Sequence, residues 1–198
     1  GFIYATVGIH PIYIKEFSKD DVEKFIDRVK EVGDMIVGIG EVGLDYNHVK
    51  ERKWWEKQRE MFLRFIGLAK EMNKPLVVHS RDAYGDALDV LEEGGARKVM
   101  LHMFGAHHLV GKVRDNDWFV SVNTIVLRSK KHKKVVRDMP LERLMLETDS
   151  PWLGLEGKRN DPRSIKVVAQ RIAEIKKVSY DEVWERCGKN AINFFGLR

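Results

Sequence analysis

The sequence has only one cysteine, Cys187, among its 198 residues. A single cysteine excludes an internal disulfide framework and a zinc site built from several thiolates. Proteins without such a framework are typical of reducing compartments, and we therefore expect a cytoplasmic protein. Because Cys187 lies between Arg186 and Gly188 in a segment with helical character, we interpret it as a structural residue.

Long apolar runs are also missing from the chain. No run of about 18 apolar residues occurs, as a transmembrane helix would need. The first residues show no signal peptide either, so we expect no membrane partner. Positive charge is in slight excess, because 35 Lys and Arg residues outnumber 30 Asp and Glu residues and leave a net charge of +5. This excess is compatible with a polyanionic partner but does not establish one.

Five short apolar runs each end in a side chain of a type that binds metals. The runs are rich in β-branched residues and Leu, which predicts strands buried on both faces in a parallel sheet. Their last polar residues are His10, Glu41, His79, His102 and Asp149. One such residue has an ordinary explanation, for example a strand-end Glu that pairs with a nearby Lys or Arg. Five of them in one chain favour a common functional site.

Helical patterns separate these strands. Apolar residues recur at helical spacing, and Ser18 with Asp21 predicts a capping box at the start of the first helix. A further strand is expected over 118–124. We expect helices over 18–33, 51–72, 83–91, 109–114 and 128–138, and a helical segment over 162–195 that restarts at Ser179. Strand and helix thus alternate through six strands, which predicts a parallel sheet.

The polar strand ends also bear on the closure of the sheet. Functional residues at the carboxyl ends of several strands must converge on one point, and a closed barrel achieves this. We therefore expect an α/β fold, a (β/α)8 barrel of the TIM type. Such barrels contain eight strands and typically about 250 residues, whereas this sequence supplies six strands in 198 residues. We expect a single barrel domain over residues 1–198 that lacks its first two strands in this numbering.

Four motifs follow one another along the chain: GIHP at 8–11, GEVGLDY at 40–46, HSRD at 79–82 and ETDSP at 147–151. In this order they resemble the TatD family of metal-dependent hydrolases and deoxyribonucleases, and the match covers essentially the whole chain. The resemblance implies an amidohydrolase-like TIM barrel that binds two divalent metal ions, with Mg, Mn and Zn all compatible with carboxylate and imidazole ligands.

The resemblance also implies roles for individual residues. Glu41 would bridge the two ions, and His79 and His102 would bind one of them. Asp149 would bind the other ion, orient the attacking water and accept its proton, so Glu41 and Asp149 are the expected catalytic residues. The first metal site lacks its usual His-x-His ligands here. His10 belongs to a different motif and cannot replace that pair.

The implied function is a TatD-like deoxyribonuclease that hydrolyses DNA phosphodiester bonds, with DNA as the partner. We expect a monomer or a small homo-oligomer. Arg81 and His10 are candidate substrate contacts. Arg81 lies two residues beyond His79, where its side chain could clamp a phosphate. The alternative for Arg81 is an ion pair with Asp82 or Asp45.

Three further residues are candidate contacts to the substrate. Trp152, just past Asp149, could stack on a base; otherwise it packs its own loop. Lys130 and Lys131 belong to a basic stretch that could contact DNA phosphates. The alternative for these two lysines is a solvated helix face.

Two other functions remain open. The chain could be an amidohydrolase-like enzyme that acts on a non-nucleic ester or amide, and salt-sensitive DNA binding would separate this from a nuclease. It could also be a non-catalytic binding protein with a degraded metal site. The absent His-x-His pair is the only support for that last alternative.

Overall fold

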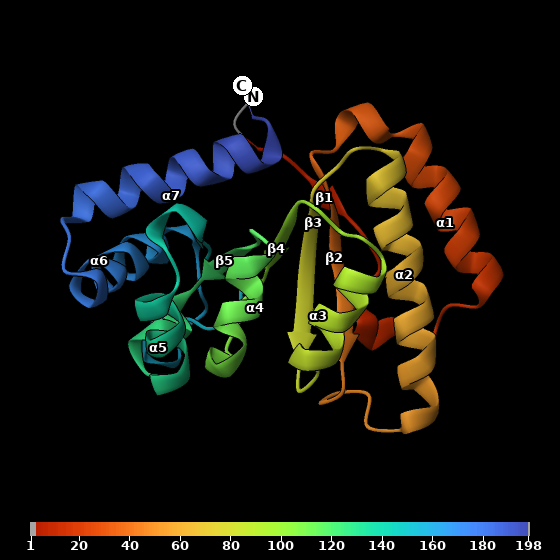
Figure 1. Ribbon diagram of the computed structural model, residues 1–198, viewed down its shortest axis with the longest axis horizontal. Coiled ribbons are helices and arrows are strands. Elements are labelled where there is room, and N and C mark those ends of the chain that lie inside the picture. Colours follow the sequence, from red (N-terminus) through yellow and green to blue (C-terminus); the bar gives the residue numbers. More distant parts are fainter. Residues whose placement is uncertain (1–2, 198) are drawn as a thin grey trace. The chain divides into compact units, whose positions relative to one another are not determined.

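The computed structural model describes residues 3–197 (Figure 1). The chain divides into two compact units, Gly1–Leu101 and His102–Arg198, and each unit has its own strands and helices. The expectation of one domain over residues 1–198 stays a prediction. The two units are therefore described one after the other.

The first unit contains four parallel strands that pair in sequence order. They are β1 (Thr6–Val7), β2 (Gly38–Asp45), β3 (Leu76–Arg81) and β4 (Val99–Leu101). Almost every residue of β2 and β3 is buried, as expected for apolar strands covered on both faces. The exceptions are Glu41 within β2 and Arg81 at the end of β3, both of which reach the surface.

The course of β2 differs from the prediction that its strand ends at Glu41. The strand runs through Glu41 to Asp45, and its register with β3 shifts between Ile39 and Val42. Gly43 permits the continuation: its φ is +141°, and a Cβ at this position would lie 2.0 Å from the backbone oxygen of His79. Only glycine allows the two backbones to approach so closely.

Helices of the first unit follow the predicted pattern with small changes at their ends. They are α1 (Lys19–Glu31), α2 (Trp55–Glu71) and α3 (Tyr84–Glu93), with short 3-10 turns η1 (Pro11–Tyr13), η2 (Gly33–Met35) and η3 (Arg52–Trp54). The capping box of Ser18 and Asp21 is confirmed. Figure 1 shows α1 and α2 side by side, and Phe25 packs against Phe65 between them with ring centroids 6.1 Å apart.

The second unit contains two parallel strands and four helices. The strands are β5 (Phe119–Val122) and β6 (Leu144–Leu146). The helices are α4 (Val110–Asp115), α5 (Lys130–Asp138), α6 (Ile165–Lys176) and α7 (Tyr180–Phe195), and the 3-10 turns are η4 (His107–Leu109), η5 (Thr124–Leu127), η6 (Leu141–Arg143), η7 (Leu155–Gly157) and η8 (Pro162–Ser164). Buried Asn190 connects α7 to η6 and β6, because its Nδ2 donates to the backbone oxygens of Leu141 and Leu144.

Six strands were predicted, and six are present among residues 3–197. Several are shorter than their apolar runs, so the polar residues follow the strands instead of ending them. His102 comes directly after β4, Glu147 comes directly after β6, and His10 lies at the start of η1, beyond β1. None of the described helices is long and apolar enough to cross a membrane.

Candidate functional site

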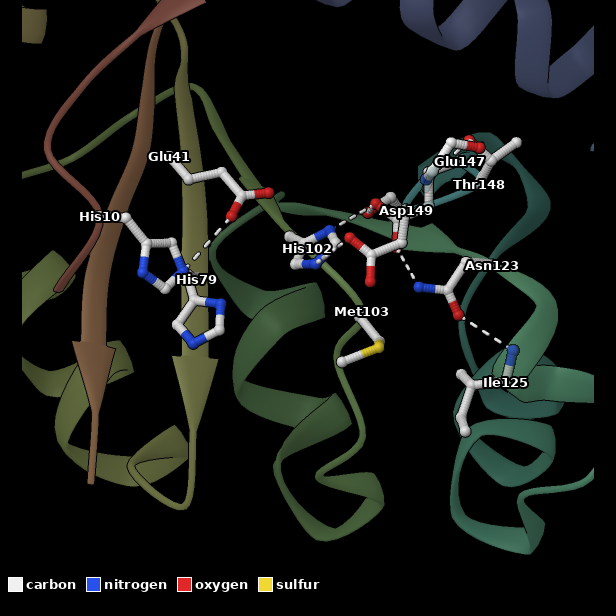
Figure 2. A network of polar contacts seen from close by, with 12 residues as sticks. His10, Glu41, His79, His102, Met103, Asn123, Ile125, Glu147, Thr148 and Asp149 are labelled. Atoms are coloured by element: carbon white, nitrogen blue, oxygen red, sulfur yellow. Dashed lines mark hydrogen bonds and ion pairs between the residues drawn. The ribbon is translucent and has the colours of Figure 1, made fainter. Parts of the chain in front are cut away.

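His10, Glu41 and His79 lie together in the first unit (Figure 2). Glu41 comes from the middle of β2, His79 from β3 and His10 from the residue before η1. One ligand atom of each residue lies within 4.8 Å of the others. His10 Nε2 is 3.6 Å from Glu41 Oε2, and the rings of His10 and His79 are 4.2 Å apart between centroids. These three predicted residues are therefore brought together.

The ring of His79 is oriented by Asp45. His79 Nε2 lies 2.9 Å from Asp45 Oδ2, and His48 Nδ1 lies 2.8 Å from the same oxygen. Burial of Asp45 opposes its ionisation, but the hydrogen bonds from His79 and His48 outweigh this effect and hold the pKa of Asp45 well below its usual value. An ionised carboxylate only accepts hydrogen bonds, so His79 Nε2 is the donor to Asp45.

Gln58 on α2 holds this part of the site in place. Its side chain is fully buried, with 0% exposure. Gln58 Oε1 accepts a hydrogen bond from the backbone nitrogen of Asp45 at 2.9 Å, and its Nε2 donates to the backbone oxygens of Asp45 and Pro11 at 3.1 and 3.3 Å. One side chain thus connects the end of β2 with the turn that follows His10.

His10 differs from His79 in its hydrogen bonding. The backbone nitrogen of Ile12 donates to His10 Nδ1 at 3.3 Å, so Nδ1 is the unprotonated nitrogen of the neutral ring. The proton then sits on Nε2, which faces Glu41. Although its position satisfies the geometry of a metal cluster, this tautomer suits His10 for donating a hydrogen bond to an anionic oxygen.

His102, Glu147 and Asp149 form a second cluster, within the second unit (Figure 2). His102 Nδ1 lies 2.7 Å from Glu147 Oε2, and His102 Nε2 lies 3.7 Å from Asp149 Oδ1. The carboxylate of Glu147 accepts a hydrogen bond from His102 Nδ1, and His102 Nε2 faces Asp149. His102 and Asp149 were both predicted as metal ligands, and the structure places them next to each other.

Glu147 is held by two further donors. Ser121 Oγ donates to Oε2 at 2.5 Å and Asn123 Nδ2 donates to Oε1 at 2.9 Å. Asn123 is itself fixed, because its Oδ1 accepts from the backbone nitrogen of Ile125 at 3.0 Å. In the sequence Glu147 stood out only as the first residue of the ETDSP motif, and its hydrogen bond to His102 was not predicted. The sequence held one indication of this contact. Two motifs each contain a pair of carboxylates, Glu41 with Asp45 and Glu147 with Asp149.

Four of the predicted substrate contacts are exposed, whereas the fifth, His10, is half-buried in the first cluster. Arg81 is the last residue of β3 and is exposed, whereas its two expected partners bind other groups: Asp82 accepts from Asn47, and Asp45 from the histidines. Lys130 and Lys131 are exposed at the start of α5. Trp152 is 71% exposed, so its ring is not buried against its own loop.

The two clusters share one feature, a histidine hydrogen-bonded to a buried or half-buried carboxylate: His79 to Asp45 and His102 to Glu147. Among the described residues, His10, Glu41 and His79 are the group whose ligand atoms lie close enough together to hold a metal ion. A carboxylate that orients a ligand histidine is the usual arrangement behind metal-binding imidazoles. Nitrogen and oxygen donors of this kind suit Zn and Mn, and the carboxylates also suit Mg.

Comparison with known proteins gives one consistent result. A family model described as TatD related DNase matches residues 1–196. The chain is 36% identical to the uncharacterized metal-dependent hydrolase YabD of Bacillus subtilis, over 99% of this chain and 78% of that protein. It is also 36% identical to deoxyribonuclease TATDN3 of Homo sapiens, over 98% of this chain and 75% of that protein.

A solved structure supports the fold. The TatD homolog YjjV of Escherichia coli matches with a TM-score of 0.89 and 24% sequence identity, over 98% of this chain and 77% of that chain. This similarity confirms the predicted fold class, an α/β fold of the TIM-barrel type.

Proposed function

The chain belongs to the TatD family of metal-dependent hydrolases, and from this premise we propose that it hydrolyses phosphodiester bonds of DNA. The observation that carries the proposal is the repeated pairing of a histidine with an orienting carboxylate, His79 with Asp45 and His102 with Glu147. This pairing prepares imidazoles to bind cations. A protein that only bound a partner through this surface would not need two such pairs.

We assign the metal ligands to Glu41, His79, His102 and Asp149. These residues would hold two divalent ions. When bound, such ions activate water near neutral pH and stabilise negative charge on phosphate oxygens. The hydrogen bond between each of the two histidine rings and a carboxylate supports their assignment, because such carboxylates orient metal-binding imidazoles.

The protein's own groups move the proton and hold the substrate. Asp149 accepts the proton of the attacking water as the new bond to phosphorus forms and the bond to the leaving oxygen breaks. His10, with its proton on Nε2, donates a hydrogen bond to an oxygen of the scissile phosphate. The Arg81 guanidinium, exposed at the end of β3, binds a second phosphate oxygen.

DNA is the proposed substrate for two reasons. A relative with 36% identity is named a deoxyribonuclease. The chain also carries exposed cations, including Arg81, Lys130 and Lys131, and a net charge of +5, which favours a polyanion. A neutral ester or amide gains nothing from these charges.

The test is hydrolysis of an end-labelled DNA oligonucleotide with Mg, Mn or Zn added, by the native chain and by Glu41→Ala and Glu41→Gln. We expect both variants to lose about a hundred-fold or more of the activity, because Gln keeps the size of the side chain but not the charge that binds cations. Glu71→Gln is the matched control, since Glu71 is exposed on α2 and pairs with Lys30.

Near-normal cleavage by Glu41→Ala would contradict the ligand assignment. A native chain that hydrolysed a carboxylic ester or amide but left DNA intact would contradict the substrate assignment. Circular dichroism melting curves of all variants show whether any loss of activity comes from unfolding.

A further inference from the structure

We propose that Trp152, Arg128 and Arg159 form a subsite that binds one nucleotide of a DNA single strand beside Asp149. The proposal rests on the proposed function and adds where the strand lies and which part of it the protein recognises. All residues of the subsite belong to the second unit.

A surface hollow of about 550 Å³ defines the subsite. It is lined by one aromatic side chain, by cations, and by small or apolar residues of a single loop: Arg128, Pro151, Trp152, Leu153, Gly154, Gly157, Lys158 and Arg159. The volume falls in the range of small-molecule sites, which is about 300 to 1,000 Å³. The hollow can therefore hold one nucleotide.

The loop that carries Trp152 is fixed at several points. The backbone nitrogen of Trp152 donates to the backbone oxygen of Asp149 at 2.8 Å. Asn160 holds the other side of the loop: its backbone nitrogen donates to the oxygen of Pro151 at 3.0 Å, and its side chain donates to the oxygen of Thr148 at 2.6 Å. Thr124 Oγ1 also donates to the backbone oxygen of Leu153.

The backbone conformation of this loop is unusual for its residues. Leu153 and Glu156 have φ values of +55° and +53°, a region that bulky residues avoid, and Asp149, of a type that tolerates this region better, has a φ of +60°. Such conformations persist when surrounding contacts enforce them, and they gather at functional sites. The result is an indole that stays 71% exposed on a loop held rigidly beneath it. An exposed but fixed aromatic ring is a stacking platform.

The charge of the hollow suits a phosphate. The described residues that line it include three cations and no carboxylate. Lys158 forms an exposed ion pair with Glu156 at 3.2 Å. Within residues 3–197 no carboxylate pairs with Arg128 or Arg159, so both guanidinium groups can bind an anion without first giving up a partner.

A stacking ring next to two guanidinium groups matches a nucleotide, which has one aromatic face and one anionic phosphate. The base must be unpaired and unstacked to cover the indole, because inside a duplex both of its faces are already covered by neighbours. Trp152 is hydrogen-bonded through its backbone to Asp149, the proposed acceptor of the water proton. The bound nucleotide therefore lies next to the phosphodiester that is cut.

The test measures binding without cleavage. Fluorescence anisotropy of a labelled oligonucleotide, with a chelator present, gives the affinity of the native chain and of Trp152→Ala for single strands and for a blunt duplex. We expect Trp152→Ala to bind the single strand about ten-fold more weakly, with Trp152→Phe close to the native chain. Trp184→Ala is the control, because Trp184 is also an exposed tryptophan of the second unit.

Salt dependence tests the two arginines. We expect Arg128→Ala combined with Arg159→Ala to reduce the slope of log affinity against log salt by about 1.4, since each phosphate contact to a single strand contributes about 0.7. Lys189→Ala, which removes an exposed cation on α7, should leave the slope unchanged.

Single-strand binding by Trp152→Ala that equals the native value would overturn the proposal. An equal loss of single-strand and duplex binding would overturn it as well, because stacking on an unpaired base would then play no part. If these binding losses occur but the native chain with metal does not cleave DNA, the subsite stands and the proposed catalytic function fails.

Discussion

Asp45 and Glu147 each set the direction in which a histidine presents its lone pair. Asp45 accepts a hydrogen bond from His79 Nε2, and Glu147 accepts one from His102 Nδ1. The two rings thus use opposite nitrogens to contact their carboxylates. Carboxylates behind ligand histidines influence metal affinity almost as strongly as the ligands themselves, although they do not touch the ion.

Changing Glu147 to Gln tests this positioning role. The change keeps the size of the side chain but removes the charge that accepts three hydrogen bonds, from Ser121, Asn123 and His102. We expect metal affinity, measured by competition with a chromophoric chelator, to fall about ten- to hundred-fold. Glu142→Gln is the control, since Glu142 is exposed near Arg186. Unchanged metal affinity in Glu147→Gln would show that Glu147 does not position His102 for metal binding.

Burial of the Cys187 thiol should make the stability of the protein fall at alkaline pH. The thiol is 1% exposed, and burial raises its pKa to about 12. An unfolded thiol has a pKa of about 8.5, so above that pH the unfolded chain holds fewer protons than the folded one and stability falls as pH rises. From about pH 8.5 to 10 this group alone lowers the free energy of unfolding by about 1.6 kcal/mol.

Urea unfolding of the native chain and of Cys187→Ala at these two pH values measures the effect. The loss of stability between the two values should be smaller in Cys187→Ala, because its other titrating groups are the same. Equal losses in both proteins would mean that the thiol is solvated in the folded state.

At the scale of elements, β2 is the strand that builds the first cluster. It places Glu41 halfway along its length and Asp45 at its end, and β3 places His79 opposite Gly43. The apolar run before Glu41 predicted this strand. Its continuation was not predicted, because the second half contains two more polar or flexible positions, and only pairing with β3 compensates for them.

The first helix allows a test of local structure that does not involve the site. Ser18 Oγ accepts from the backbone nitrogen of Asp21 at 3.1 Å, and Asp21 Oδ2 accepts from the backbone nitrogen of Ser18 at 3.0 Å. We expect Ser18→Ala to lower the free energy of unfolding by about 1 kcal/mol in urea titrations, with Ser18→Asn near the native value. A fully stable Ser18→Ala would show that α1 is held by packing alone.

At the scale of the whole molecule, metal binding should be coupled to folding. In each cluster the acidic and imidazole side chains come from separate segments of the chain, so the cluster forms only when its unit is folded. A metal ion present at about 100 times its dissociation constant therefore adds about 2.7 kcal/mol of stability. We expect added Mn or Zn to raise the melting temperature of the native chain.

His79→Ala should show a smaller rise in melting temperature than the native chain, because it lacks one ligand. His108→Ala serves as the control, since His108 is an exposed histidine in η4. The same rise in His79→Ala as in the native protein would mean that the ion binds elsewhere.

The sequence by itself determined the order of six strands, the helices between them and the caps of Ser18 and Ser179. These features depend on apolar spacing and on hydrogen bonds between near neighbours, which are legible along the chain. The metal ligands and substrate contacts that the sequence indicated stay predictions. The TatD membership and the α/β fold of the TIM-barrel type were both confirmed.

Only the tertiary structure decided which nitrogen of each histidine contacts a carboxylate and which tryptophan is exposed. Those properties come from partners far away in the chain: His79 and Asp45 are 34 positions apart, and His102 and Glu147 are 45. A one-dimensional pattern reports which side chains an element buries, since that repeats with the period of the element. It does not report which donor meets which acceptor across two elements, because register shifts such as the one in β2 determine that pairing.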